Sequence, residues 1–387
     1  MKFIHTSDWH LGQILMGKSR EEEHKLFLEW LLKEIENEKA DLLIIAGDVF
    51  DTATPPVYAQ KLYFEFLSRT VRTSCEKIVV AAGNHDSVSL LEASKELLSF
   101  FNVKVVTKEA EILEFDDAIL IAVPFLREKF LLKALRNKTA KEDEKRVVNA
   151  VKEYYDLLYR KALKIARNRP IVATGHLSVT GSESSGSERE IYIGNLSSIE
   201  SDFFKERFDY TALGHFHKKQ SFGKSVAYCG SPIPLNFKES RFKKAVLSVE
   251  ISKGKLSVKE IEVPAFRKLF SLKTPSLEKE TLFKEIPENS WVEIVLEGEN
   301  EGEFIYEEIK EAAKEKNIEV LAVKCERENE PSLSFENENI FIEDLSPLAV
   351  FRKRIEQDTD EEEKRELEAL FLKILNETEL KEEDEDQ

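Results

Sequence analysis

The stretch Ile44-Ile45-Ala46-Gly47-Asp48-Val49-Phe50-Asp51 decides the fold that we predict for this chain. It continues an apolar run that starts at Leu42 and is typical of a buried strand, and it ends in a glycine followed by carboxylates. In layered α/β sheets, the side chains that bind ligands lie at the C-terminal ends of the strands. A single Gly-Asp after a strand is weak support, because many such aspartates only cap a turn.

The same pattern, an apolar run that ends in Asp, Asn or His, occurs at four more places in the chain. The four ends are Asp8-Trp9-His10 after Phe3–Ser7, Gly83-Asn84-His85-Asp86 after Ile78–Ala82, Gly175-His176 after Pro170–Thr174, and Gly214-His215-Phe216-His217 after Tyr210–Leu213. Five of the seven histidines lie at these ends, which is more clustering than chance would give.

Helical and strand patterns alternate along the first hundred residues. Helical spacing of apolar residues is found in Arg20–Glu38, Val57–Val71 and Val88–Phe100, between strands at Lys2–Thr6, Leu42–Ala46 and Ile78–Ala82. This order predicts a layered α/β sheet. Further segments are predicted as strands at Val103–Val106, Ala118–Val123, Ile171–Thr174, Phe208–Leu213, Ser225–Tyr228, Lys244–Ile251 and Lys255–Val263, and as mostly helix at Lys129–Ala166. The second set of strands favours two sheets packed together.

A chain of 387 residues is long enough for about two or three domains. We predict a main domain over 1–263, a small α/β module over 264–340, and a helical pair with an acidic tail over 341–387. The prediction of the small α/β module rests on a β-α-β pattern at Trp291–Leu296, Phe304–Lys316 and Glu319–Lys324. A polar segment at Glu326–Asn339 follows and is predicted to be a linker. In the helical pair, an apolar stripe either packs on the neighbouring helix or docks a partner; it consists of Leu367, Leu370, Phe371 and Ile374.

Composition narrows the class of protein. No apolar run approaches the about 18 residues of a membrane span, and the first residues do not resemble a signal peptide, so we expect a cytoplasmic protein with no membrane association. The net charge of −17 argues against simple nucleic-acid binding, although 17 of the acidic residues lie in 341–387 with only 7 basic ones. Cys75, Cys229 and Cys325 lack C-x-x-C spacing and are predicted to be buried, inert thiols.

The polar strand ends predict a site for two metal ions. Asp8 and His10 are two apart on an extended segment and so point the same way, as do His215 and His217. Oxygen and nitrogen ligands without thiolate favour Mn²⁺, Fe²⁺ or Zn²⁺. Two such ions, about 3.5–4 Å apart, clamp the attacking and leaving oxygens of a phosphoryl transfer and lower the pKa of a shared water. The seven candidate ligands are Asp8, His10, Asp48, Asn84, His176, His215 and His217.

Structural roles compete with these functional ones. A single histidine at a strand end is more often a hydrogen-bonding structural residue than a ligand. His5 is predicted to pack within its strand, and His24 to be solvated on its helix. His85 is predicted to be a general acid or a cation facing the phosphate, with Asp86 fixing its tautomer, or else a residue that only orients a ligand. The Gly- and Ser-rich Thr180–Ser187 is either a plain surface loop or a mobile flap beside the site.

The five polar strand ends, in this order, resemble the motifs of the calcineurin-like metallophosphoesterase superfamily. Longer runs are similar to the SbcD family of bacterial nuclease subunits: His5-Thr-Ser-Asp-Trp-His-Leu-Gly12, Ala46-Gly-Asp-Val-Phe-Asp-Thr52, Ala82-Gly-Asn-His-Asp-Ser87, Ala173-Thr-Gly-His-Leu177 and Tyr228-Cys-Gly-Ser-Pro-Ile-Pro-Leu235. The resemblance covers nearly the whole chain and weakens after Pro264. Asp51 is given no role, since other branches of the wider family have histidine there.

The resemblance implies two face-to-face sheets with helices outside. It also implies one cation on Asp8, His10, Asp48 and His217 and another on Asp48, Asn84, His176 and His215, with His85 aiding protonation or charge stabilisation. The implied activity is Mn²⁺-dependent DNA cleavage, endonucleolytic on single strands and hairpins and 3′–5′ exonucleolytic on duplexes, in DNA repair, recombination and replication.

The implied partner is SbcC, an SMC-like ATPase that itself binds the ATP, and the implied assembly is a homodimer within a heterotetramer. In this family the module after the main domain caps the DNA site and the terminal helices dock on the ATPase. Two alternatives stay open: a small-molecule phosphodiesterase or phosphatase on the same scaffold, and a binding protein with a dead site. A cap and a helical tail argue against the first, and the complete ligand set argues against the second.

Overall fold

The computed structural model describes residues 1–127, 144–188, 198–252, 254–274, 282–297, 309–314 and 316–326. The chain divides into two compact units, Met1–Glu326 and Arg327–Gln387, and all described residues belong to the first. The predicted linker beyond Glu326, the helical pair and the acidic tail lie outside the described residues. The predicted domain limits at 263/264 and 340/341 therefore stay predictions.

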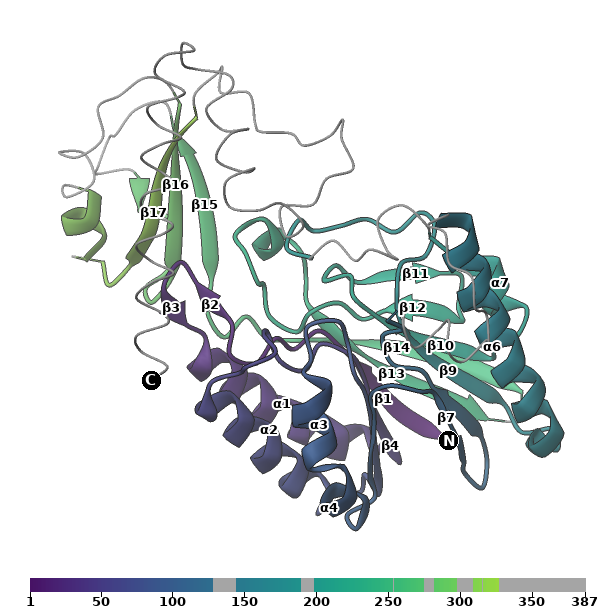
Figure 1. The fold of residues 1–387 in the computed structure, drawn as a ribbon. Helices are drawn as coiled ribbons and strands as arrows, with labels where there is room; N and C mark the ends of the chain where they lie inside the picture. The colour runs from purple at the N-terminus through teal and green to yellow at the C-terminus, as the bar shows by residue number, and fades with distance from the viewer. Residues whose placement is uncertain are drawn as a thin grey trace, which may run out of the picture. The chain divides into compact units, whose positions relative to one another are not determined.

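Two six-stranded sheets form the main body (Figure 1). The first has the order β14 (Lys255–Glu262), β13 (Ala245–Ser252), β1 (Lys2–Thr6), β4 (Leu42–Ala46), β5 (Lys77–Ala81) and β6 (Val103–Val106). The second has the order β11 (Gln220–Phe222), β12 (Val226–Tyr228), β10 (Tyr210–Gly214), β9 (Ile171–His176), β8 (Ile119–Ala122) and β7 (Glu111–Glu114). The neighbours β1, β4, β5 and β6 are parallel, as are β8, β9, β10 and β12. Within each sheet, the strands that precede predicted ligands therefore run in the same direction, and their C-terminal ends lie at the same edge of the sheet.

Alternation along β4 shows how the sheets stack. Leu42 and Ile44 join the apolar layer between the two sheets, whereas Leu43 and Ile45 pack under helices. Burial on both faces explains why this strand is a continuous apolar run. Helices α1 (Glu21–Glu38), α2 (Val57–Thr70), α3 (Val88–Ala93) and α4 (Lys95–Ser99) contribute to the core outside the first sheet, and α6 (Glu144–Ala166) and α7 (Ser201–Lys205) to that outside the second (Figure 1). The predicted α/β fold of two face-to-face sheets with flanking helices is confirmed.

A three-stranded parallel sheet follows the main body in the chain. Its strands are β15 (Leu269–Thr274), β16 (Trp291–Glu297) and β17 (Glu319–Glu326), and residues 309–314 are helical. The two strands of the predicted β-α-β pattern are confirmed, but β15 was not predicted. Trp291 and Leu269 pack with Leu15, which belongs to the short hairpin β2 (Ile14–Leu15) and β3 (Lys18–Ser19).

Several local predictions need correction. The single helix predicted at Val88–Phe100 is two short helices separated at Ser94. The edge strands β7 and β11 were missed. His24 is completely buried in α1 rather than solvated, because it continues the apolar face of that helix. The thiols of Cys75 and Cys229 are buried, as predicted. Within the described ranges, no helix is long and apolar enough to cross a bilayer.

Candidate metal centre

The polar ends of five strands meet at one place between the two sheets. The loops after β1 and β4 stay paired beyond the strands, since Asp8 N donates to Gly47 O at 2.9 Å and His10 N to Asp48 O at 3.1 Å. A hydrogen bond from His215 N to Asp8 Oδ1, at 2.9 Å, connects the loop after β10 of the second sheet to the loop after β1 of the first. Backbone hydrogen bonds thus bring together residues from distant parts of the chain.

The backbone around the predicted ligands is strained. Asp8, His10, Asp48 and His215 have φ values of 53°, 47°, 50° and 108°, in or near the left-handed region that residues other than glycine rarely adopt. Such conformations persist where the surrounding structure enforces them and concentrate at functional sites. Gly83 is required for a different reason: a Cβ there would overlap the Asp48 carboxylate and main-chain nitrogen.

One group of ligands is formed by Asp8, His10 and His217. Their ligand atoms all lie within 4.8 Å of one another, and all three side chains are buried. The Nε2 atoms of the two histidines are 3.2 Å apart. Two ring nitrogens that face each other at this distance, beside a buried carboxylate, suit a shared cation.

A second group is formed by Asp8, Asp48 and His176. Asp48 Oδ1 accepts a hydrogen bond from His85 N at 2.9 Å, which leaves Oδ2 at 3.2 Å from His176 Nε2 and 3.8 Å from His10 Nε2. Asn84 Oδ1 lies 2.9 Å from His176 Nε2. Asp48 therefore stands between both groups, where the bridging ligand of two cations has to be.

His215 lies at the edge of this arrangement. Its ring centroid is 5.5 Å from that of His176, and among the described residues its side chain belongs to no group of three close ligands. Burial lowers the pKa of His215 to about 3, so the imidazole is neutral and able to coordinate. The structure thus gathers six predicted ligands tightly and places His215 beside His176.

The electrostatics of Asp48 and His176 are those of a preformed ligand pair. Burial alone would raise the pKa of Asp48, but His176, through charge and a hydrogen bond, holds it well below its usual value. Burial would lower the pKa of His176, yet Asp48 raises it to about 9. Such a pair holds a proton in the space that a divalent cation would take, so cation binding would displace that proton. The residues present therefore fit a two-metal centre.

His85 lies next to the ligands, and its ring is fixed by the main chain. Nδ1 is 2.7 Å from Asp51 O, and the ring meets that of His10 edge-on with centroids 4.8 Å apart. We predicted that Asp86 would fix this tautomer, but the contact at Nδ1 is with Asp51 O. The Asp86 carboxylate instead accepts hydrogen bonds from the main-chain nitrogens of Gly83, Val49 and Phe50, at 2.8, 3.2 and 3.0 Å. It joins the loops after β4 and β5.

A groove of about 470 Å³ opens beside His85. Its lining includes Asn84 and Ser87, two cationic residues, Lys108 and Arg127, and two acidic residues, Asp86 and Glu92. Lys108 is paired with Glu92 at 2.5 Å. The groove connects the predicted ligand Asn84 to basic residues on the protein surface, which suits an anionic substrate that extends beyond the reacting phosphate.

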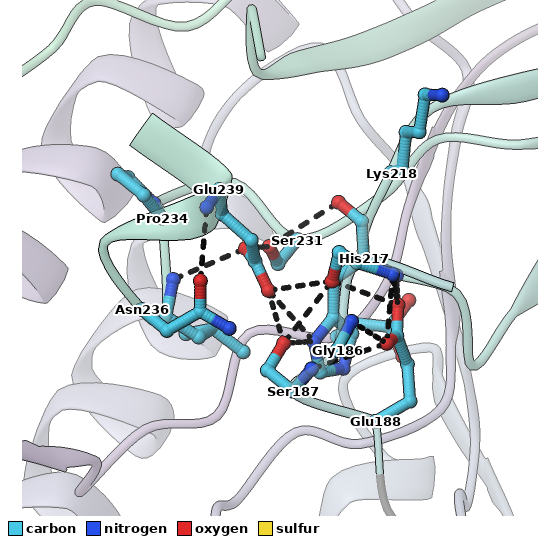
Figure 2. Close-up of polar contacts among 12 residues, drawn as sticks. Gly186, Ser187, Glu188, His217, Lys218, Ser231, Pro234, Asn236 and Glu239 are labelled. Atoms are coloured by element: carbon cyan, nitrogen blue, oxygen red, sulfur yellow. Dashed lines mark hydrogen bonds and ion pairs between the residues drawn. The ribbon is translucent and has the colours of Figure 1, made fainter. Parts of the chain in front are cut away.

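Sequence reasoning missed the carboxylates behind the histidines. Asp51 Oδ1 lies 3.1 Å from His10 Nδ1. Glu239 Oε1 lies 3.3 Å from His217 Nδ1, and Figure 2 shows these two residues. Glu239 belongs to the short 3-10 helix η1 (Lys238–Arg241). Its only sequence signal is an acidic residue after Pro-Leu-Asn-Phe-Lys, a stretch that carries no periodicity.

The segment Thr180–Ser187 lies beside the site. Ser187 Oγ is 2.6 Å from His217 Nδ1, and the next residue, Glu188, accepts a hydrogen bond from His217 N at 2.9 Å (Figure 2). Ser185 is buried and donates to Glu239 at 2.8 Å. Of the two interpretations, a plain surface loop is wrong for this part of the segment, because it is anchored on a predicted ligand.

Comparison with known proteins identifies the family. Residues 1–219 match the calcineurin-like phosphoesterase family, and residues 266–359 match the type 5 capsule protein repressor C-terminal domain. The SbcD component of nuclease SbcCD from Escherichia coli K12 is 36% identical over 97% of this chain and 98% of its own length. This chain belongs to the SbcD family. The SbcD proteins of Rhodobacter capsulatus and Bacillus subtilis are 34% and 32% identical, each over 66% of this chain and 67% of their own.

Family membership fixes the general chemistry. Residues 1–219 of this chain match the calcineurin-like phosphoesterase family, and the described residues hold the grouped carboxylates and imidazoles that a dimetal hydrolase requires. The protein is therefore a hydrolase with a dimetal site. The predicted resemblance to this family is confirmed.

Proposed function

We propose that this protein is a DNA nuclease that depends on Mn²⁺, cleaving single-stranded and hairpin DNA endonucleolytically and duplex DNA as a 3′–5′ exonuclease. The observation that carries the proposal is the whole-length similarity to SbcD nucleases, in a chain whose predicted ligands converge. The proposed role is in DNA repair, recombination and replication, in the cytoplasm.

The proposed ligand sets are those that the family resemblance implies, and the two groups of close ligands support them in part, with Asp8 common to both groups. One cation is assigned to Asp8, His10, Asp48 and His217, and the other to Asp48, Asn84, His176 and His215. Support comes from Asp48 Oδ2, which lies within 4 Å of both His10 Nε2 and His176 Nε2. When bound, two divalent cations neutralise the phosphodiester and lower the pKa of a shared water.

His85 is proposed to hold or deliver a proton at the reacting phosphate. Because Nδ1 contacts Asp51 O, Nε2 is the ring atom that would meet a substrate oxygen. The ring is also close to His10 and lines the groove, so it can act on a phosphate held at the predicted ligands. Asp86, predicted to be catalytic, is better supported as a residue that positions Gly83 and the Asp48 loop.

The groove beside His85 is proposed to hold the DNA strand next to the cleaved bond. Arg127 supplies positive charge there, whereas the charge of Lys108 is offset by its ion pair with Glu92, and phosphate contacts dominate the affinity of most nucleic-acid complexes. Because the chain has a net charge of −17, it repels the DNA phosphates overall. We therefore expect local cationic residues and a partner protein to contribute to the binding of duplex DNA.

The proposed partner is an SbcC-like SMC ATPase, which binds the ATP, and the proposed assembly is a homodimer within a heterotetramer. The support is the name of the relatives, which are subunits of a nuclease called SbcCD. Residues 264–340 are proposed to cap the DNA site and 341–387 to dock on the ATPase. Co-purification with the ATPase that is lost when the chain is cut before Ser346 would support this docking role.

A cleavage assay tests the proposed activity. The purified protein is incubated with a labelled DNA hairpin and, separately, with bis(p-nitrophenyl) phosphate and cyclic nucleotides, each with Mn²⁺ or with EDTA. Cleavage of the hairpin that requires Mn²⁺ is expected. Fast hydrolysis of a small nucleotide ester without any DNA cleavage would instead identify a small-molecule phosphodiesterase.

A further inference from the structure

The two histidines proposed for the first cation share a feature. Each has a carboxylate oxygen near Nδ1, the ring nitrogen opposite the one that faces the site: Asp51 Oδ1 at 3.1 Å for His10, and Glu239 Oε1 at 3.3 Å for His217. His217 Nδ1 also lies 2.6 Å from Ser187 Oγ, and that hydroxyl donates to the same Glu239 oxygen. His176, proposed for the second cation, has a neutral acceptor there, since its Nδ1 lies 3.0 Å from Ala46 O. His10 and His217 thus differ from His176 in the charge behind the imidazole.

Glu239 is held rigidly for this contact. The side chain is completely buried, and Oε2 accepts hydrogen bonds from Lys244 Nζ at 2.6 Å and Leu235 N at 3.1 Å. It also accepts one from Ser231 Oγ at 3.2 Å (Figure 2). Lys244 Nζ also donates to His217 O at 3.1 Å. The Glu239–Lys244 pair therefore fixes both the ring and the main chain of His217.

A carboxylate at Nδ1 has two effects on a coordinating imidazole. It keeps the proton on Nδ1, so that the Nε2 lone pair points at the cation, and it makes that lone pair more basic. Losing such a partner typically weakens metal binding by about 10- to 100-fold. A main-chain carbonyl fixes the same tautomer without adding a full negative charge.

We propose that Asp51 and Glu239 are positioning residues that make the cation position of His10 and His217 the tighter of the two, so that the two positions fill in sequence. The inference rests on the cation ligands of the proposed function but not on DNA as the substrate. The competing explanation is that Glu239 and Lys244 only hold the loop between β12 and β13 together.

Titration of the full chain with Mn²⁺, without DNA, tests the proposal. The electron paramagnetic resonance signal of free Mn²⁺ reports how many ions bind and at what concentration. Two steps are expected for the wild type, and the substitution His176→Ala, which removes a ligand of the second position only, should abolish the weaker one. Simultaneous filling of two equal positions would overturn the inference.

Two variants probe the carboxylates. Asp51→Asn changes a partly exposed side chain, and the double variant Glu239→Gln with Lys244→Gln removes both charges at once, so that no unpaired ammonium stays buried. Each should weaken the tighter step by about 10- to 100-fold and the weaker step by less than about 3-fold. Equal weakening of both steps, or no change in either, would contradict the proposal.

Controls separate positioning from folding. Glu38→Gln removes a buried, lysine-paired carboxylate at the end of α1, a feature that the titration should not sense. Should the double variant fail to fold, Asp51→Asn alone decides the outcome. A protein that fills two positions in sequence but leaves DNA intact would refute the proposed activity and keep this inference. A protein that binds no Mn²⁺ would refute both.

Discussion

The Nε2 atoms of His10 and His217 lie 3.2 Å apart, although 207 residues separate the two histidines in the chain. Both rings are buried, and both have Nδ1 beside a carboxylate. Two lone pairs directed at one point repel each other unless a proton or a cation lies between them. This contact is therefore the most direct sign in the structure that the site is built for cations.

Replacing His85 should separate chemistry from metal binding. The substitution His85→Asn is expected to lower kcat for DNA cleavage by about 10²- to 10⁴-fold, because the ring lines the groove as a proton donor rather than as a proposed ligand. Binding of Mn²⁺ should change less than about 3-fold, since the main-chain contact from residue 85 to Asp48 persists. An equal loss of cleavage and of bound Mn²⁺ would remove the assigned role.

The substitution Gly83→Ala adds only one methyl group but should abolish Mn²⁺ binding at the candidate metal centre. Its Cβ would overlap Asp48, so the carboxylate has to move away from His176. Loss of Mn²⁺ binding and a lower melting temperature are expected. The matched control is Gly254→Ala, which has open space around it and a φ of +73°, and so costs only about 1 kcal/mol of backbone strain. Normal metal binding by the Gly83 variant would show that the site tolerates displacement.

Removing Arg127 should weaken binding of DNA but not of small esters. For Arg127→Ala, we expect a KM for DNA about 5- to 10-fold higher. The slope of the logarithm of DNA affinity against the logarithm of salt concentration should become shallower by about one, which corresponds to one lost phosphate contact. Hydrolysis of bis(p-nitrophenyl) phosphate should be unchanged. Lys164→Ala, an exposed cation at the end of α6, serves as the control. Equal effects of both variants would mean that only overall charge matters.

Glu38 should make stability depend on pH. Although burial opposes it, hydrogen bonds from Lys2, Lys259 and Ser248 lower the pKa of this carboxyl to about 2, below its ordinary 4.5. Its stabilisation is therefore complete above pH 4.5 and is lost as the pH falls towards 2. At pH 7, Glu38→Gln should unfold about 1–2 kcal/mol more easily in urea, and the difference should vanish near pH 2. A difference that does not vary with pH would argue against this linkage.

The predicted ligands at the ends of the strands could be found from the sequence, whereas the side chains that contact those ligands from behind could not. Asp48 and His176 follow apolar runs directly, and parallel strands bring such ends to one edge. Glu239 lies in a loop without periodicity, so its contact with His217 becomes visible only in three dimensions. The missed edge strands β7 and β11 are short and partly exposed, which leaves a weak alternation in sequence.

The sequence held a usable signal for the burial of His24 but none for the contacts of Asp86. His24 is spaced from Leu28, Leu31 and Ile35 by four, seven and eleven residues, which is the spacing of the buried face of α1. Asp86 was assigned to the ring of its sequence neighbour, but the turn after β5 directs its carboxylate to main-chain nitrogens of two loops. Adjacency in sequence says little about contacts in a tight turn.

The order of strands in the first sheet has a consequence for how the protein is made. β1 is synthesised first but lies between β4 and β13, with Lys2 opposite Glu250. During translation, one of the two neighbours of β1 therefore emerges from the ribosome after most of the main body. A chain that ends before β13 would leave β1 with β4 as its one neighbour in the first sheet, although all seven proposed ligands precede that strand in the sequence.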